Sequence, residues 1–454
     1  MNRQERRAAL SLAGVYAFRM LGLFMILPVF ALYAEHLQGV TPALTGLAIG
    51  AYGITQALLQ IPAGLLSDRI GRKPVIIGGL LVFALGSLVA AGADSIHLVI
   101  LGRALQGAGA IAAAIMALTA DLTREEQRIK AMAMIGMSIG LSFAAAMILG
   151  PVLNEWVGVP GIFWITALLA LGGIGIVAFI VPRPPATRRH REAEAVPAQF
   201  GRVLRNPELL RLDFGILVLH TLLTASFVVL PLMLRDEIGL AAGDHWKLYL
   251  PVLAASVLGM IPFIFMAGRK GRLKAVFLGA VAVLGLAELG LYVLPPTLTS
   301  VVVLLIVFFS AFNLLESMLP SLVSRVAPVD CRGTALGFYS SAQFLGAFLG
   351  GMLGGLVQGA YGLHGVFVFA ALLALVWLLA AGFMRAPRRL TSYIYRTEVT
   401  DQAGAERLSA ELSGLAGVAE AAVIVEDGLA YLKVDKRVFD ETRLPGAVAE
   451  PVSR

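Results

Sequence analysis

The stretch that decides the fold reads GLLSDRIGRKP, from Gly64 to Pro74, and it lies between two long apolar runs. It carries four charges within six residues, at Asp68, Arg69, Arg72 and Lys73. Such a density of charge is too costly for the hydrocarbon interior of a membrane, so we expect a loop at a membrane face. The alternative is an ordinary positively charged loop of the kind that membrane proteins keep in the cytoplasm.

The composition of the whole chain also indicates a membrane protein. Hydrophobic residues make up 58% of it and charged residues only 14%, whereas about 25% of a soluble domain is charged. A transmembrane helix needs about 20 mostly apolar residues. Twelve such segments can be placed, at Leu10–Ala34, Ala43–Leu66, Pro74–Ala93, His97–Ala120, Ala131–Leu153, Gly161–Val181, Leu212–Leu234, Trp246–Ala267, Ala275–Leu294, Thr297–Val323, Gly333–Ala360 and Gly365–Met384.

The positive residues behind the net charge of +7 lie in alternate loops between the spans, and this distribution argues against a nucleic-acid partner. Lys and Arg gather in alternate loops, near residues 3–7, 69–73, 124–130, 183–211, 269–274, 325–332 and 385–389, whereas the remaining loops hold only Arg235 and Lys247. Because positive loops stay in the cytoplasm, we expect both termini to be cytoplasmic in a multi-pass protein of a bacterial-type inner membrane.

The chain divides into two transmembrane halves, a linker and a soluble tail. We expect a first six-helix half at 1–182, a Pro-rich cytoplasmic linker at 183–211 with a short helix at Gln199–Arg205, a second six-helix half at 212–388 and a tail at 389–454. In the tail, the predicted strands are Tyr393–Val399, Val418–Val425 and Leu429–Val434, and the predicted helices are Gln402–Ser413 and Val438–Val448. This order indicates a small α+β ferredoxin-like domain.

The charged loop identifies a family by resemblance. The pattern G-x-L-S-D-R-x-G-R-K resembles the signature loop between helices 2 and 3 of the major facilitator superfamily, whose two six-helix halves are parallel repeats. The segments LFMILP, AIGAYGITQALLQIPAGLLSD, FNLLESMLPSL and GTALGFYSSAQFLG resemble its YajR-like, drug:proton antiporter branch, as does the cysteine-free ferredoxin-like tail. The resemblance implies secondary active transport by alternating access.

The resemblance also implies that helices 1, 4, 7 and 10 line a central cavity. Each of these helices carries one embedded ionisable residue, at Arg19, Arg103, His220 and Glu316. Because histidine titrates near neutral pH, we expect Glu316 and His220 to couple proton movement to substrate exchange. The alternative is structural: His220 bonds to backbone, and Glu316 pairs with Asn313 or with a loop base.

Two further embedded charges need an interpretation. Arg103 lies in LGRALQGAGA, which resembles the helix-4 motif R-x-x-Q-G of the superfamily, with Gln106 as its hydrogen-bond partner. It is either an electrostatic partner of an acid in the proton cycle or a clamp between helices. Arg19 could instead extend toward an interface. Glu288, in helix 9, is interpreted as structural or incidental, either facing protein or bent toward the outer surface.

The resemblance assigns conformational roles to two other sets of residues. In helix 5, Gly140, Gly150 and Pro151 resemble the antiporter Gly-Pro motif, although the pattern departs from it at residues 152–154; plain helix packing is the alternative. The signature loop is expected to clamp the halves in the outward-facing state. For this, Asp68 would contact the N-terminus of helix 11 near residues 333–335, and Arg72 would pair with Asp121; the other loop members are Gly64, Arg69, Gly71 and Lys73.

These features favour a proton-coupled transporter that exports small amphipathic or drug-like compounds. No nucleotide-binding or hydrolytic motif occurs in a suitable context, so we expect no enzyme and no cofactor or metal. The expected partners are a small-molecule substrate, protons and membrane lipid, and the tail is expected to regulate or to bind a partner. The alternatives are a proton-coupled symporter for nutrient uptake and a non-transporting sensor that signals through the tail.

Overall fold

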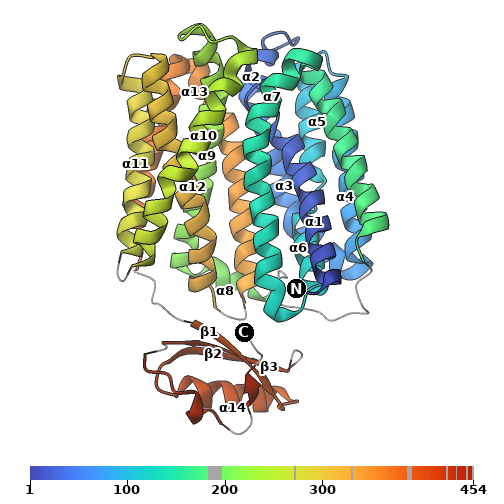
Figure 1. Cartoon of the computed structure of the whole chain (residues 1–454), viewed down its shortest axis with the longest axis vertical. Helices are drawn as coiled ribbons and strands as arrows, with labels where there is room; N and C mark the ends of the chain where they lie inside the picture. The colour runs from blue at the N-terminus through green and yellow to red at the C-terminus, as the bar shows by residue number, and fades with distance from the viewer. Residues whose placement is uncertain are drawn as a thin grey trace.

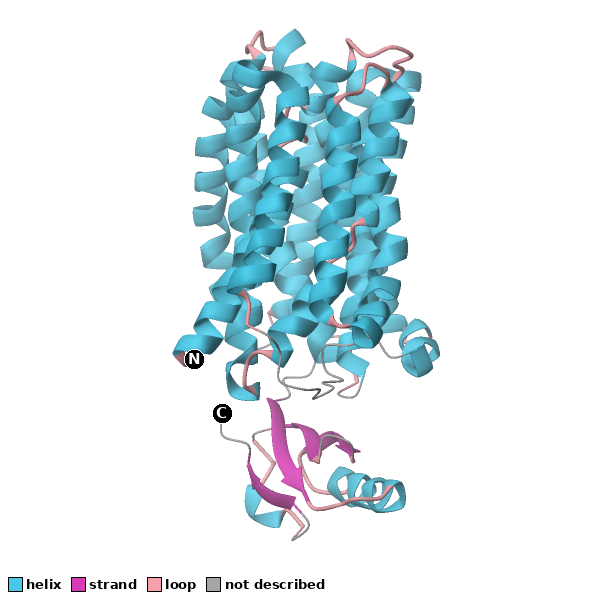
Figure 2. Cartoon of the chain, turned by 90° about the vertical axis from the view of Figure 1, so that its right-hand side faces the viewer, coloured by secondary structure: helices cyan, strands magenta, loops and turns pink. Residues whose placement is uncertain are grey.

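The chain is a long helical bundle with a small α+β domain at one end (Figure 1). The computed structural model describes residues 1–182, 197–269, 272–328, 331–385, 391–425, 428–435, 437–445 and 448–451. We call the end of the bundle that carries the α+β domain the tail-side end, and the opposite end the far end. The chain starts at the tail-side end, and the helices run roughly parallel to the long axis in both views (Figures 1 and 2).

The helices of the bundle follow the predicted order. The first half holds α1 (Arg3–Phe24), α2 (Phe30–Ala34), α3 (Pro42–Ile70), α4 (Arg72–Ala91), α5 (Ile96–Ala108), α6 (Ala112–Asp121), α7 (Glu125–Gly175) and the π-helix η1 (Ile176–Ile180). The second half holds α9 (Pro207–Asp236), η4 (Ala242–Asp244), α10 (His245–Gly268), α11 (Leu273–Val293), α12 (Leu298–Val326) and α13 (Arg332–Gly382).

The structure confirms twelve spans, although two pairs are continuous helices. Ten candidate spans are found among the described residues, and two of these, in α7 and α13, are 51 residues long. Each of the two contains a glycine in the left-handed region, Gly158 with φ 67° and Gly362 with φ 75°, where one helix passes directly into the next. Each of these two long helices holds two spans, so the ten candidates correspond to twelve spans. Glycine suits these positions because it lacks the Cβ that disfavours positive φ.

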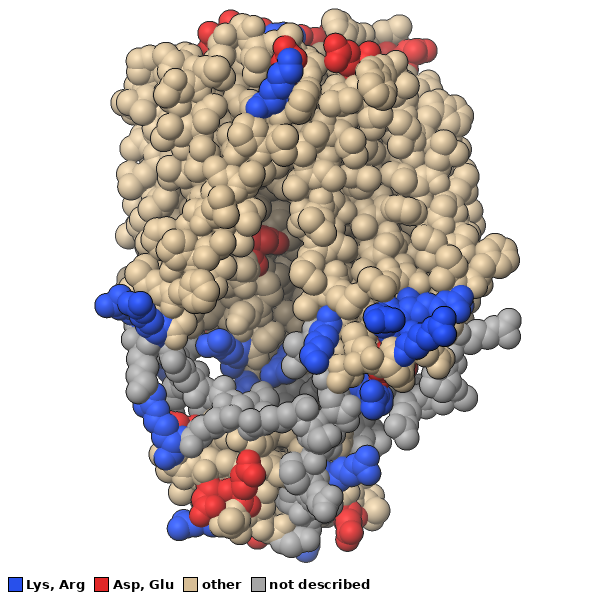
Figure 3. Space-filling view, in the orientation of Figure 1, with Lys and Arg blue, Asp and Glu red and all other residues tan. Residues whose placement is uncertain are grey.

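The two halves meet through glycines toward the far end. A Cβ added to Gly46 of α3 would lie 2.1 Å from the Gly351 carbonyl oxygen of α13, and one added to Gly50 would lie 2.7 Å from the Phe348 oxygen. We call this contact the far-end seam. At the same end, Arg235 Nη1 donates to Glu35 Oε2 over 2.6 Å, which joins α9 to the segment after α2. Nearer the tail-side end the surface of the bundle is hollowed (Figure 3).

The predicted linker is only partly described, because residues 183–196 lie outside the described residues. After them come the 3₁₀ turn η3 (Pro197–Gln199) and the helix α8 (Phe200–Leu204), which agree with the short helix expected here. The helix α9 begins at Pro207, five residues before the predicted start, because Asn206 caps it: the Asn206 side chain accepts hydrogen bonds from the Glu208 and Leu209 backbone amides.

The tail has the strand order of a ferredoxin-like sheet, and its described residues include one α-helix. Strands β1 (Thr391–Thr397), β2 (Val418–Ile424), β3 (Leu429–Val434) and β4 (Val448–Pro451) pair in the order β2-β3-β1-β4, and α14 (Gln402–Ser413) packs on the sheet through Leu408 and Leu412. The helix predicted at Val438–Val448 is wrong. Among the described residues this segment forms only a 3₁₀ turn, η6 (Glu441–Arg443), and Val448 already belongs to β4.

One lysine joins the tail to the bundle. Lys433 of β3 donates from Nζ to the Arg325 carbonyl oxygen, over 3.2 Å, and to the Ala327 carbonyl oxygen. Its ammonium also pairs with Glu420 Oε2 at 3.2 Å, and its side chain is 6% exposed. The carbonyls at a helix C-terminus carry partial negative charge and favour a cation. Lys433 therefore docks the sheet on the C-terminal end of α12.

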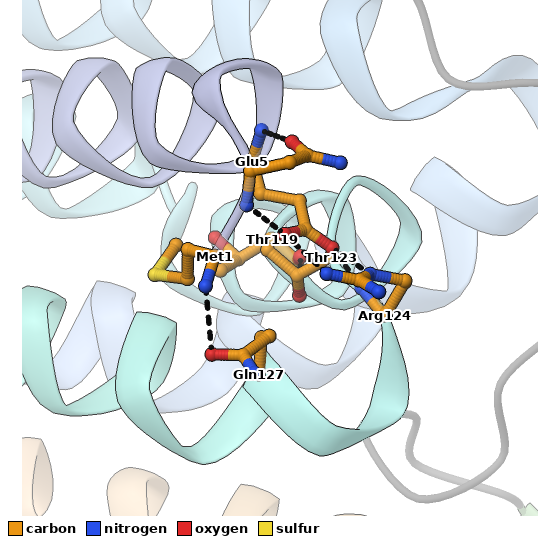
Figure 4. Close-up of polar contacts among 7 residues, drawn as sticks. Met1, Glu5, Thr119, Thr123, Arg124 and Gln127 are labelled. Atoms are coloured by element: carbon orange, nitrogen blue, oxygen red, sulfur yellow. Dashed lines mark hydrogen bonds and ion pairs between the residues drawn. The ribbon is translucent and has the colours of Figure 1, made fainter.

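The N-terminal segment is held on the connection between α6 and α7 (Figure 4). Glu5 accepts hydrogen bonds from the Arg124 backbone amide over 3.1 Å and from Arg124 Nε over 2.8 Å. The Met1 amino group donates to Gln127 Oε1 over 3.1 Å. The Glu5 carboxylate, 4% exposed in the ion pair, thus joins the start of α1 to the start of α7.

Candidate functional site

A polar cluster in the second half brings Glu316 and His220 together through a glutamine. Gln343 of α13 donates from Nε2 to Glu316 Oε1 over 3.1 Å, and the same nitrogen lies 2.9 Å from His220 Nε2. His220 Nε2 and Glu316 Oε2 are 3.9 Å apart. An amide NH₂ has two protons, one for each neighbour. Gln343 therefore bridges the two residues expected to bind protons, and we call the three the Glu316 cluster.

The hydrogen bonds of this cluster specify one form of the histidine. His220 Nδ1 lies 3.3 Å from the Ile216 carbonyl oxygen, which can only accept, so Nδ1 carries a proton. The Gln343 amide donates to Nε2, so Nε2 is an acceptor and the imidazole is neutral. The structural alternative for His220, a bond to backbone, is thus realised at one nitrogen, while the other nitrogen faces the cluster.

Two side chains of the cluster are partly exposed. The Glu316 side chain is 36% exposed and that of His220 is 15% exposed, although both lie within transmembrane helices. Acidic side-chain atoms are visible inside the hollow in Figure 3. Asn313 does not belong to this cluster: its Nδ2 donates to Ser256 Oγ of α10 over 3.2 Å. The alternative in which Glu316 pairs with Asn313 is therefore wrong.

The arginines of the first half are buried inside it and do not line the hollow. Arg103 is 2% exposed and Arg19 is fully buried. Arg103 donates from Nη1 to Gln106 Oε1 over 2.8 Å and from Nη2 to the Ile49 carbonyl oxygen of α3 over 3.3 Å. Gln106 in turn donates to Ser87 Oγ of α4 over 2.7 Å. This geometry corresponds to the helix-clamp alternative for Arg103.

Arg19 has its own set of partners. It donates from Nη2 to Gln56 Oε1 over 2.6 Å and to the Gly109 carbonyl oxygen over 3.1 Å. The guanidinium carbons of Arg19 and Arg103 each lie 5.5 Å from the centre of the Tyr52 ring, so one aromatic ring contacts both guanidinium groups. The alternative in which Arg19 extends toward an interface is wrong, because the side chain is fully buried and donates to an amide and a carbonyl oxygen in the interior.

The signature loop forms several polar contacts within the first half. Arg72 pairs with Asp68, donates from Nη1 to Ser67 Oγ over 2.8 Å, and pairs through Nε with Asp121 Oδ2 at 3.3 Å. The expected contact of Arg72 with Asp121 is thus present. The expected contact of Asp68 with the start of α13 is not seen among the described residues, because Asp68 bonds to Arg72 instead. The halves are joined at the far end here, so that contact stays a prediction for the outward-facing state.

The other signature-loop residues differ in their surroundings. Gly71 has φ 98°, a conformation that favours glycine, and it separates α3 from α4. Lys73 donates from Nζ to the Val181 carbonyl oxygen over 2.6 Å, while Arg69 is exposed. A Cβ on Gly64 would lie 3.0 Å from the Ala113 Cβ, so glycine allows α3 and α6 to approach closely.

The helix-5 motif is only partly a packing feature. A Cβ on Gly150 would lie 2.6 Å from the Met25 carbonyl oxygen and 2.9 Å from Pro28 Cγ, so glycine is required where α7 crosses the segment after α1. Pro151 follows inside the helix. A Cβ on Gly140 would meet no atom within 4 Å. The packing role expected of Gly140 is therefore wrong in this conformation.

Sequence reasoning missed the uncharged members of these networks. Gln343, Gln56 and Tyr52 connect the charged residues, but a search for embedded ionisable groups passes over amides. The two glutamines could have been found as polar residues in otherwise apolar spans. Among the described residues, no group of three or more His, Cys, Asp and Glu is placed to hold a metal ion.

Comparisons with known proteins agree with this architecture. A family model described as Major Facilitator Superfamily matches residues 12–348 and 214–410. The chain belongs to the major facilitator superfamily. It is therefore a multi-pass membrane transporter and not an enzyme. The chain is 46% identical to the inner membrane transport protein YajR of Escherichia coli over 447 residues, which cover 98% of each chain.

More distant similarities extend through the superfamily. The chain is 27% identical to the multidrug resistance protein MdtH of Aeromonas salmonicida over 322 residues, 70% of this chain and 79% of that protein. The structure of a bacterial homologue of the human lysosomal transporter Spinster, inward-facing and occupied, matches with a TM-score of 0.68 at 14% identity, covering 85% of this chain and 97% of the other. At this identity the likeness shows the fold alone.

Proposed function

We propose that this transporter couples proton movement to the efflux of small amphipathic or drug-like compounds by alternating access across a bacterial inner membrane. The observation that carries the proposal is the Glu316 cluster, a carboxyl and an imidazole bridged by one amide and exposed to the hollow between the halves. Few other charges accompany it, which suits an apolar or amphipathic substrate. The resemblance to a multidrug resistance protein supports the same substrate class.

In this proposal the tail-side end is cytoplasmic, because the positively charged loops lie there. The far-end seam is closed and the hollow opens on the tail side, so the structure corresponds to an inward-facing state. A proton that reaches Glu316 from the cytoplasm removes the negative charge to which Gln343 donates. The amide is then free to reorient, and its contact with His220 changes with it. The cluster thereby ties protonation on α12 to the relative position of α9 and α13.

The tail is proposed to regulate this cycle. Lys433 binds the end of α12, the helix that carries Glu316, so docking of the tail and movement of α12 are mechanically linked. A ferredoxin-like domain that only stabilised the chain would not need a buried lysine bound to the end of a moving helix. The regulatory proposal is separate from the transport proposal.

The proposed function is tested by transport in inverted membrane vesicles that hold a proton gradient, with a panel of amphipathic cations, neutral drugs and sugars. Compounds that are exported dissipate the gradient, and the Glu316→Gln variant is expected to lose the pH dependence of transport. Asp244→Asn is the matched control, because Asp244 pairs with Lys247 at the far end, away from the cluster. An unchanged pH dependence in Glu316→Gln would refute the role of Glu316. Movement of the substrate out of the vesicle lumen together with protons would show a symporter instead.

A further inference from the structure

A second carboxyl group is buried in the second half, away from the hollow. Glu288 of α11 is fully buried. Its Oε1 lies 2.7 Å from Ser226 Oγ of α9. Its Oε2 has no hydrogen-bond partner among the described residues. Of the two alternatives from sequence, this position agrees with a Glu288 that faces protein and not with one bent toward the outer surface.

The hydrogen bonds around Ser226 determine where the protons are. Ser226 Oγ lies 2.8 Å from the Leu222 carbonyl oxygen and 2.7 Å from Glu288 Oε1. A hydroxyl has one proton to donate, and a backbone carbonyl can only accept. If Ser226 donates to Leu222, as helix geometry favours, then the oxygen of Glu288 must supply the proton of the second bond. The geometry is satisfied by a protonated Glu288.

The surroundings of Glu288 favour the same form. The space around its carboxyl is lined by leucines and by four aromatic rings, at Phe227, Phe308, Phe309 and Phe367, and has a volume of about 10 Å³. This volume is at the lower limit for a single water molecule. No charged side chain other than Glu288 lines it among the described residues from α9, α11, α12 and α13. On the neighbouring α10, the Tyr249 ring lies 6.1 Å from that of Phe227.

An ionised carboxylate would be costly in this pocket. One of its oxygens would have no donor and the other only a shared hydroxyl, in an environment where an uncompensated charge is strongly disfavoured. Protonation removes that cost by providing a donor for the Ser226 oxygen. The proton is therefore an integral part of the structure at this site.

We propose that Glu288 with Ser226 forms a second proton-binding site, occupied and sealed in this conformation. Ser226 is six residues beyond His220 along α9, which places the site about 9 Å closer to the far end. The protonation of Glu288 does not depend on the proposed function, whereas a role of this proton in transport rests on it. A proton held there is positioned to exchange when the far-end seam opens.

Infrared spectroscopy of the full chain in lipid tests the protonation directly. The difference spectrum between the unchanged protein and Glu288→Gln at neutral pH is expected to show the C=O stretch of a protonated carboxyl. Ser226→Ala removes the hydrogen-bond acceptor, so the same band is expected to move to higher frequency. This second variant keeps the test decisive if Glu288→Gln does not fold. A difference spectrum that contains only carboxylate bands would overturn the proposal.

Exchange into D₂O tests whether the site communicates with solvent. The Glu288 band is expected to shift slowly in the unchanged protein and at least tenfold faster in Gly46→Ala. The added methyl group in this variant would clash with α13 and force the far-end seam apart. Equal rates would show a purely structural proton and overturn the proposal. Glu316→Gln is the matched control and is expected to leave the Glu288 band in place. Loss of pH-dependent transport in Glu316→Gln concerns the proposed function, whereas the Glu288 band concerns only this site.

Discussion

Replacing Lys433 by Met is expected to release the tail from the bundle. The ammonium donates to two carbonyl oxygens at the end of α12, those of Arg325 and Ala327. A hydrogen bond that involves a charged group contributes about 1.5–3 kcal/mol. In the unchanged protein, a lysine released from the bundle would regain water and keep its pair with Glu420, which offsets part of the lost hydrogen bonding. We therefore expect Lys433→Met to lower the docking free energy by about 2–3 kcal/mol. That loss corresponds to a change of about 30- to 150-fold in the ratio of docked to released tail.

The release can be measured as a distance distribution between two spin labels. One label at Glu406→Cys lies on α14 and the other at Arg385→Cys lies beyond the end of α13, in a Cys331→Ala background because Cys331 is the single native cysteine. The distribution is expected to broaden in Lys433→Met. Arg437→Met, which removes an exposed cation of the same domain, is the matched control. A narrow distribution in Lys433→Met, or equal broadening in both variants, would refute the reasoning.

Three other substitutions test separate contacts. Asp68→Asn removes the carboxylate that pairs within the signature loop, at a cost of about 1–3 kcal/mol; we expect slower transport in vesicles by a protein that still folds, and full activity would contradict a role in the cycle. Gly46→Ala places a methyl group against the Gly351 carbonyl, which costs about 1–3 kcal/mol in the closed seam; crosslinking between α3 and α13 should decrease, and an unchanged yield would argue against the seam. Glu5→Ala leaves the Arg124 amide without its acceptor and should lower the free energy of unfolding by about 1–3 kcal/mol; a melting temperature equal to that of the parent would show that the contact is dispensable.

The fold could be predicted from the sequence because membrane spans are long and the signature loop is specific. The twelve spans and three of the tail strands follow from local patterns, and the pairing of Arg72 with Asp121 follows from the family resemblance of the signature loop. The second tail helix could not form because Pro445 and Gly446 interrupt its segment, a signal that outweighs the helical spacing before it.

The candidate site was harder to predict than the fold. Sequence can show that a helix carries Arg103 or Glu316, but the direction of a side chain depends on neighbours from other helices. Arg103 faces the interior because backbone carbonyls of α3 come within reach of its guanidinium, and this contact joins residues 54 positions apart. Gln343 became part of the site only through its distances to Glu316 and His220. These relations are set by packing and not by any one segment.

The glycine contact between α3 and α13 has a consequence for how the transporter would respond to its surroundings. Main-chain surfaces in direct contact carry no titratable group and no mobile ion, so the attraction between them is independent of acidity and ionic strength. An ion pair that joins the two halves at that end, Arg235 with Glu35, is 36% and 44% exposed and so contributes about 0–1 kcal/mol. The free energy of closure at that end therefore changes little with pH or ionic strength. The chemical conditions of the two compartments act on the cycle through other parts of the molecule.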